Sequence, residues 1–220
     1  LTLQSMCQTG NIFVGFFELL RNTVLAGAYP CAFPAMTCLS ERYTLFVFDL
    51  DGTLADTRED ITASVNHALR RFRVAPLSAD RVTRYVGDGA RALMERVLGP
   101  TAVSEDLDRA LVDFLVHYRE ACTQNTRLYP GVAETLAGLE GKDLAVLTNK
   151  PELHTLKILS ALKILGAFRK VVSGDGPWPK KPDPAGLLSL VEGLGHPKDR
   201  VLLVGDSGVD IQTARSAGTS

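Results

Sequence analysis

The fold is decided by one stretch of sequence, TLFVFDLDGT, at residues 44–53. Its first half, 44–48, is a short continuous run of apolar and β-forming side chains, typical of a strand buried on both faces. Two carboxylates, Asp49 and Asp51, follow directly, and Gly52 permits a sharp turn behind them. Carboxylates at a buried strand end are costly unless a cation or hydrogen bonds compensate them. The stretch therefore predicts a buried strand that carries a charged site.

Three further apolar runs of the same kind follow along the chain, at 144–147, 170–172 and 201–204. Helix-length segments of amphipathic spacing separate these runs, at 152–165 and 184–194. Strands that alternate with helices indicate βαβ units and hence a parallel sheet. We expect an α/β fold with a Rossmann-like parallel sheet at its core.

The interval between the first two predicted strands has a different pattern. Apolar residues recur there at helical spacing, and no convincing strand interrupts them between 56 and 128. A helical block inserted into a sheet is typical of a lid. We therefore predict an all-helical cap domain at 56–128, inserted into a catalytic core formed by 41–55 and 129–220.

Residues 1–40 differ from both parts of the chain. The segment 11–29 is apolar, but Glu18 and Arg21 interrupt it, whereas a membrane-spanning helix needs about 20 mainly apolar residues. No basic region precedes the segment, which argues against a secretory signal. Because a strong strand begins soon after Met36, we predict that 1–40 is a non-core extension and that Met36 is the natural start.

The charges of the chain nearly balance, with 24 Lys and Arg against 25 Asp and Glu. This balance argues against nucleic acid and membrane surfaces as partners, so an anionic substrate must be held by local charges. The four cysteines form no CxxC pair and no zinc-ligand cluster, and we expect free thiols in the cytoplasm. The sequence makes no prediction of the oligomeric state.

Three more polar clusters lie beyond the predicted strands, TN at 148–149, KKPDP at 180–184 and GDSGVD at 205–210. Each cluster has an ordinary explanation when it is taken alone. The first is common in turns, the second is explained by a pair of solvated lysines, and the third by acids that cap a helix. Open parallel sheets, however, bind ligands outside the carboxyl ends of their strands, where these clusters converge with Asp49 and Asp51. Together they supply a carboxylate nucleophile, oxygen ligands for Mg²⁺, polar donors and a lysine. That set fits phosphoryl transfer.

The four clusters, in this order and at these strand ends, resemble the haloacid dehalogenase superfamily of aspartate-nucleophile phosphohydrolases. The resemblance extends over residues 44–218. Within the superfamily the chain is most similar to the bacterial phosphoglycolate phosphatase subgroup, through the stretches YPGV at 129–132, LTNKP at 147–151, KKPDP at 180–184 and GDS at 205–207.

The resemblance implies a role for each matching residue of the reaction centre. Asp49 would be the nucleophile, forming an aspartyl-phosphate, and a ligand of Mg²⁺. Asp51 would bind Mg²⁺ through its backbone carbonyl, protonate the leaving oxygen and then activate water. Lys181, the lysine directly before the proline, would neutralise the charge of Asp49 and the phosphate.

The resemblance also implies the residues that hold the phosphate and the metal ion. Thr148 and the amide of Asn149 would bind phosphate oxygens. Asp206 would be a ligand of Mg²⁺, and Asp210 would be either a further ligand or an acceptor that orients a bound water.

Two features narrow the expected reaction. Dehalogenases of this superfamily lack an acid at the position of Asp51, since a halide needs no proton on leaving, so Asp51 indicates a phosphate ester as substrate. The interval 56–128 contains no lysine, which argues against the Schiff-base chemistry of phosphonate cleavage. A small phosphorylated metabolite is therefore expected, namely 2-phosphoglycolate, which would be hydrolysed to glycolate and phosphate. Arg91 or Arg84, beside a glycine-rich turn, is the predicted partner of its carboxylate, with a solvated helical arginine as the alternative.

Other interpretations remain open at this stage. A sugar-phosphate phosphatase or a β-phosphoglucomutase-like phosphotransferase would carry the same four clusters. A third alternative is an inactive, C-terminally truncated product, because the chain ends at Ser220, where the superfamily's sheet normally continues. Missing strands would expose an edge of the sheet.

Overall fold

The computed structural model describes residues 39–72, 74–100 and 102–220. The apolar segment 11–29 and the predicted start at Met36 lie outside the described residues, so both stay predictions. Within the described part of the chain, no helix is long and apolar enough to cross a membrane.

Four parallel strands form the central sheet, in the spatial order β5-β4-β1-β6. The strands are β1 (Leu45–Phe48), β4 (Asp143–Leu147), β5 (Lys170–Val172) and β6 (Val201–Val204). They confirm the four predicted apolar runs to within one residue at each end. In the register, Phe48 lies opposite both Val146 and Val204, so the carboxyl ends of the three strands meet at one edge. This is the edge that the sequence predicted for the site.

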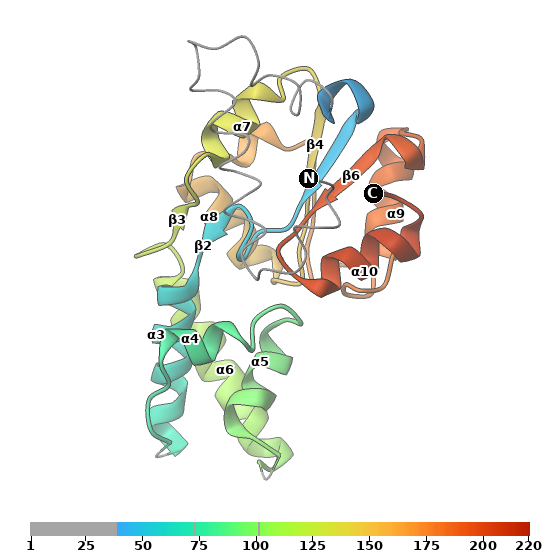
Figure 1. The fold of residues 1–220 in the computed structure, drawn as a ribbon. Helices are drawn as coiled ribbons and strands as arrows, with labels where there is room; N and C mark the ends of the chain where they lie inside the picture. Colours follow the sequence, from blue (N-terminus) through green and yellow to red (C-terminus); the bar gives the residue numbers. More distant parts are fainter. Residues whose placement is uncertain (1–38, 73, 101) are drawn as a thin grey trace.

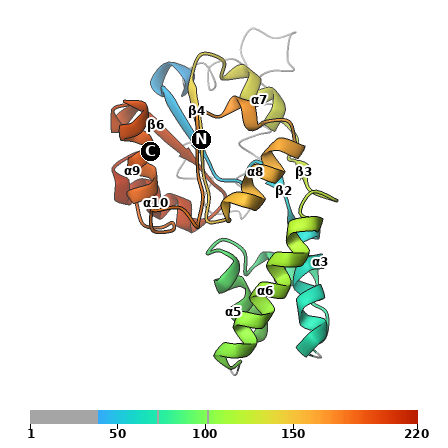
Figure 2. The same ribbon diagram turned by 180° about the vertical axis from the view of Figure 1, so that it is seen from behind.

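Alternate side chains of β1 explain how helices cover both faces of the sheet. Leu45 and Val47 are fully buried among residues of α9 (Ala185–Leu194) and α10 (Gly208–Ala217). Phe46 and Phe48 point to the other face, into the cluster that contains residues of α7 (Val132–Gly138) and α8 (Glu152–Ala161). Figures 1 and 2 show the resulting layers, with α7 and α8 on one side of the sheet and α9 and α10 on the other.

A helical insertion separates β1 from β4 in the sequence. It consists of α3 (Arg58–Leu69), α4 (Ala79–Thr83), α5 (Ala90–Leu98) and α6 (Ser104–Ala121). In both ribbon views these helices form a separate lobe beyond the carboxyl ends of the strands (Figures 1 and 2). The described residues also contain short 3₁₀ helices at Arg70–Phe72, Leu165–Ala167 and Lys198–Arg200.

The two linkers between the lobes contain strands that the sequence analysis missed. β2 (Ala55–Asp56) pairs antiparallel with β3 (Arg127–Leu128), so the chain enters and leaves the helical insertion side by side. Each strand has two residues, too few for any periodicity to show in the sequence. The predicted boundaries at 56 and 128 fall within this paired neck.

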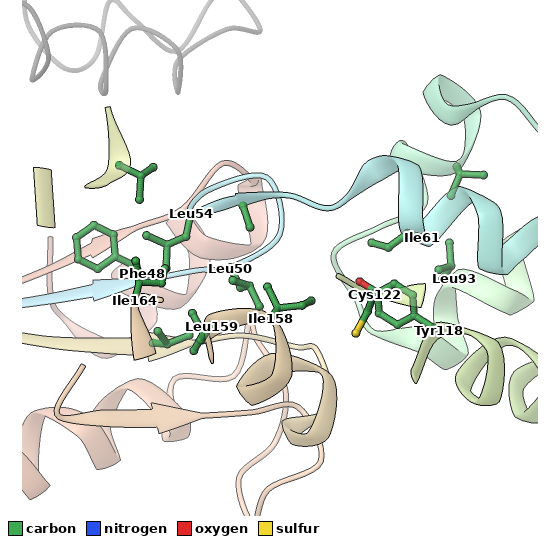
Figure 3. Packing of buried hydrophobic residues seen from close by; sticks show 14 of the residues in the cluster. Phe48, Leu50, Leu54, Ile61, Leu93, Tyr118, Cys122, Ile158, Leu159 and Ile164 are labelled. Atoms are coloured by element: carbon green, nitrogen blue, oxygen red, sulfur yellow. The ribbon is translucent and has the colours of Figure 1, made fainter. Parts of the chain in front are cut away.

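One apolar cluster continues from the sheet lobe into the helical insertion. Figure 3 shows labelled members from both lobes, among them Phe48, Leu50 and Ile158 on one side and Ile61, Leu93 and Tyr118 on the other. Burial of this shared surface stabilises the insertion against the core by the hydrophobic effect.

β6 is the edge strand of the sheet, and its outer side is partly paired. The amide of Leu203 donates to the carbonyl of Ser220 at 2.8 Å, and the amide of Ser220 donates to the carbonyl of Val201 at 3.2 Å. The predicted exposure of this edge is therefore only partial in the described residues.

Candidate active site

The centre of the site is a buried lysine between two carboxylates. Asp49 follows β1 directly, and its Oδ1 atom lies 3.0 Å from Nζ of Lys181. The same Nζ atom lies 2.5 Å from Oδ1 of Asp210, in the first turn of α10. Burial by itself disfavours the charged lysine, but Asp49 and Asp210 outweigh it and raise the pKa of Lys181. Lys181 is thus a permanent positive charge beside the nucleophile candidate.

Three carboxylates converge at this point with more negative charge than one lysine neutralises. Ligand oxygens of Asp49, Asp206 and Asp210 lie within 4.8 Å of one another. The pKa of Asp49 is raised to about 7, chiefly by burial and also by the charges of Asp210 and Asp51, while Lys181 opposes the rise. Burial, together with the Asp210 charge, raises the pKa of Asp206 to about 6. The donor set, all carboxylate oxygen, fits a hard divalent cation such as Mg²⁺.

Asp210 differs from the other two carboxylates in that both of its oxygens have partners in the described part of the chain, whereas Asp49 and Asp206 each have a partner at Oδ1, Lys181 at 3.0 Å and the Thr53 hydroxyl at 3.4 Å. Oδ2 accepts hydrogen bonds from the backbone amide and the hydroxyl of Ser207, at 3.1 and 2.5 Å, and Oδ1 contacts Lys181. These bonds close a capping box at the start of α10. The geometry is therefore compatible with the second of the two predicted roles of Asp210, an acceptor that orients a bound water, and both roles stay predictions. Asp206 is the more exposed of the two residues.

Two glycines make room for the acidic side chains, one between the two loops and one within the second loop. Gly52 has a φ angle of +83°, and a Cβ atom there would lie 2.3 Å from Oδ2 of Asp206. A Cβ atom on Gly205 would lie 2.1 Å from Cγ of Asp210. A side chain at position 52 would push the loop of Asp49 and Asp51 away from Asp206, and a side chain at position 205 would displace Asp210 within its own loop.

Asp51 does not point into the carboxylate cluster. Both of its carboxylate oxygens lie 2.7 Å from Nζ of Lys150, and Oδ1 accepts a hydrogen bond from the Thr57 hydroxyl at 2.6 Å. Lys150 belongs to the LTNKP stretch, but no role was predicted for it. Its position directly after the predicted phosphate-binding pair was the one signal available.

Thr148 and Asn149 lie at the end of β4, and both are buried. The Asn149 side chain is fully engaged: Nδ2 donates to the carbonyls of Gly87 and Lys181, at 2.9 and 3.0 Å, and Oδ1 accepts from the Lys181 amide at 2.8 Å. The side chain of Asn149 is thus occupied, and binding of a phosphate oxygen by its backbone amide stays a prediction.

The structure does not bring Arg91 to this cluster. Its guanidinium pairs with Asp108 at 2.8 Å and with Glu95 at 3.5 Å on the surface of the helical insertion. Arg84 is exposed directly after α4. The assignment of either arginine to the substrate carboxylate therefore stays a prediction.

A parallel sheet with helices on both faces, a helical insertion after the first strand, and an Asp–Lys–Asp cluster at the strand ends are together typical of a Rossmann-like hydrolase whose site is built on aspartates. A family model described as haloacid dehalogenase-like hydrolase matches residues 46–220. The chain belongs to this family.

Individual relatives agree with this assignment. A phosphoglycolate phosphatase from Agrobacterium fabrum is 39% identical over 178 residues, which are 79% of this chain and 76% of that protein. A phosphoglycolate phosphatase from Pseudomonas putida is 39% identical over 181 residues, 79% of this chain and 66% of its own length. The crystal structure of a predicted phosphoglycolate phosphatase from Haemophilus somnus has a TM-score of 0.77 and 34% identity, covering 81% of this chain and 84% of that one. The predicted family, fold class and enzyme class, a phosphatase, are confirmed.

Proposed function

We propose that the chain hydrolyses 2-phosphoglycolate to glycolate and phosphate through a phosphorylated Asp49. The observation that carries the proposal is the position of Lys181, whose ammonium contacts Asp49 and Asp210 at once. A carboxylate nucleophile beside a fixed positive charge can approach a phosphate dianion, which an isolated carboxylate would repel. The similarity to phosphoglycolate phosphatases supports the choice of substrate.

The first half of the reaction transfers the phosphoryl group to the protein. An oxygen of Asp49 attacks phosphorus, the bond between phosphorus and the ester oxygen breaks, and Asp51 gives its proton to the leaving oxygen. The Thr148 hydroxyl and the Asn149 amide hold the phosphate oxygens, while Lys181 offsets the charge that accumulates on them. Splitting the displacement into two steps lowers the barrier of each.

The second half regenerates the free enzyme. A water oxygen attacks phosphorus, Asp51 accepts a proton from that water, and the bond between Asp49 and phosphorus breaks to release phosphate. The Lys150 contact suits this step, because it stabilises Asp51 as a carboxylate that can accept a proton.

Asp49 and Asp206 would hold Mg²⁺ with one carboxylate oxygen each and Asp51 with its backbone carbonyl, while Asp210 would orient the site. When bound, the cation neutralises phosphate charge and helps to align the substrate. Cytoplasmic location also belongs to this proposal; it is consistent with the free thiol of Cys122.

The proposal is tested by measuring phosphate release from a panel of monoesters with and without Mg²⁺. The panel contains 2-phosphoglycolate, sugar phosphates and a neutral phosphate ester, and Asp49→Asn is the control. We expect Mg²⁺-dependent release from 2-phosphoglycolate that falls at least about 10³-fold in Asp49→Asn. Faster turnover of sugar phosphates would favour the alternative substrates, and activity that survives in Asp49→Asn would refute the mechanism.

A further inference from the structure

The side chain of Asn149 joins three parts of the molecule that are far apart in the sequence. It is 4% exposed and forms hydrogen bonds to Gly87 in the helical insertion and to both backbone groups of Lys181. An amide is suited to this place, because it offers two N–H donors and one acceptor in a single plane. A carboxylate cannot donate to the two carbonyls, and an apolar side chain would leave all three backbone groups without this partner.

Gly87 belongs to a segment that we call the insertion loop, residues 85–89, between α4 and α5. Arg96 of α5 fixes the loop to its own lobe. Its Nη1 atom donates to the Tyr85 carbonyl at 3.0 Å, and its guanidinium also pairs with Asp88. Its other side reaches the sheet lobe at Asn149. The loop is therefore held between an anchor in the insertion and an anchor in the core.

Gly89 shows how closely the loop approaches the core. Its φ angle is +92°, and a Cβ atom there would lie 3.2 Å from the Asn149 carbonyl and 2.6 Å from Nζ of Lys180. The backbone can lie against the core at this point because glycine has no side chain and adopts positive φ without strain.

We propose that the Asn149 side chain is a positioning residue that docks the insertion loop on the core and, through the same amide, fixes the backbone of Lys181. Closure of the loop and placement of the lysine that faces Asp49 are thereby coupled. This inference rests on the proposed function, because the coupling affects catalysis through the role proposed there for Lys181.

The inference is tested with Asn149→Ala, compared with Asn66→Ala as a matched control. Asn66 makes the same kind of bonds, Nδ2 to the Leu77 carbonyl at 3.0 Å and Oδ1 from the Leu77 amide at 2.8 Å, but wholly within the helical insertion. Hydrogen exchange is measured on the insertion loop of the full chain. We expect at least about tenfold faster exchange there in Asn149→Ala and an unchanged rate in Asn66→Ala.

Kinetics supply a second readout with a distinct signature. Since the backbone amide that would bind phosphate is retained, Asn149→Ala should lower kcat about 30-fold and change KM less than about threefold. Asn149→Asp keeps the acceptor for the Lys181 amide but loses both donors, so it should loosen the loop like Asn149→Ala.

A third variant changes the loop side of the contact. Gly89→Ala leaves Asn149 in place but obstructs docking, so it should raise exchange of the insertion loop to the level of Asn149→Ala, and the double variant should add nothing further. Loop exchange that stays at the wild-type rate in both Asn149→Ala and Gly89→Ala would overturn the inference. Absence of phosphatase activity from the wild type would refute the proposed function alone, because the exchange experiment needs no substrate.

Discussion

Lys150 holds Asp51 by both carboxylate oxygens, each 2.7 Å from the lysine Nζ atom, and the lysine side chain is 5% exposed. Burial by itself disfavours the charged form of this lysine, but the charge and hydrogen bonds of Asp51, together with Tyr118, outweigh burial and raise the lysine pKa. The same ammonium lies 4.8 Å from the centroid of the Tyr118 ring, which belongs to α6 of the helical insertion. Lys150 thus contacts the proposed general acid, Asp51, in the core and, through a cation–π interaction, Tyr118 in the helical insertion.

Lys150→Met should damage both stability and turnover. Removing the ammonium leaves the largely buried Asp51 carboxylate without its counter-charge, at a cost of about 3 kcal/mol in the free energy of unfolding. Turnover of 2-phosphoglycolate should fall about 10²-fold, because Asp51 loses its fixed orientation. Urea unfolding and steady-state kinetics measure the two effects.

A double variant separates the ion pair from general damage. In Lys150→Met combined with Asp51→Asn no buried charge is left alone, so most of the lost stability should return. If the stability losses of the two single variants instead sum to the loss of the double variant within about 0.5 kcal/mol, the two side chains are not coupled.

The parts of the site that lie at strand ends could be predicted from the sequence, because a strand is recognised from a short local pattern. A continuous apolar run marks a buried strand, and parallel strands bring their carboxyl ends together, so the convergence of Asp49, Lys181 and Asp206 was predictable from the sequence alone. The contacts of Lys150 and of the Asn149 side chain depend on how two lobes and a loop pack. Such tertiary partners leave no periodicity in the sequence.

Asp60 illustrates the same limit and carries the second prediction. An acid in the first turn of α3 looks like ordinary helix chemistry. Its carboxylate is instead 1% exposed and accepts hydrogen bonds from the backbone amides and side chains of Asn125 and Thr126, at 2.8–3.0 Å. These two residues directly precede β3, so Asp60 ties together the two linkers between the lobes.

Asp60→Ala should therefore destabilise the protein by about 3 kcal/mol, since several buried donors lose a charged acceptor. Glu59→Ala is the matched control, because the neighbouring Glu59 is exposed and meets only Arg127, at 3.4 Å. The control should cost less than about 0.5 kcal/mol. Equal losses in the two variants, measured by urea unfolding, would contradict the role of Asp60 as a tie between the linkers.

The crowded carboxylates predict how stability depends on pH and metal. The pKa of Asp49 rises on folding from 3.8 to about 7, so the folded molecule holds more protons than the unfolded chain between these values. Stability contributed by this group is present below about pH 4 and is lost as the pH rises through about 7.

Without Mg²⁺, the unfolding midpoint should fall by roughly 5 °C more between pH 5 and pH 8 in the wild type than in Asp49→Asn. Mg²⁺ binds the ionised carboxylates of the folded state and should restore the midpoint at pH 8 with little effect at pH 5. Thermal unfolding with EDTA or Mg²⁺ measures this difference. A midpoint at pH 8 that does not respond to Mg²⁺ would argue against a metal site at these carboxylates.

The substrate carboxylate gives the last prediction, on Arg91. If this guanidinium leaves Asp108 and Glu95 to meet 2-phosphoglycolate, the exchange costs little, because both existing pairs are exposed. Arg91→Ala should then lower kcat/KM for 2-phosphoglycolate about tenfold relative to a neutral phosphate ester. Arg109→Ala, which removes another exposed arginine of the insertion paired with Glu105 at 3.8 Å, should leave that ratio unchanged. An unchanged ratio in Arg91→Ala would refute the assignment, and the same comparison with Arg84→Ala would then decide whether either arginine selects the substrate.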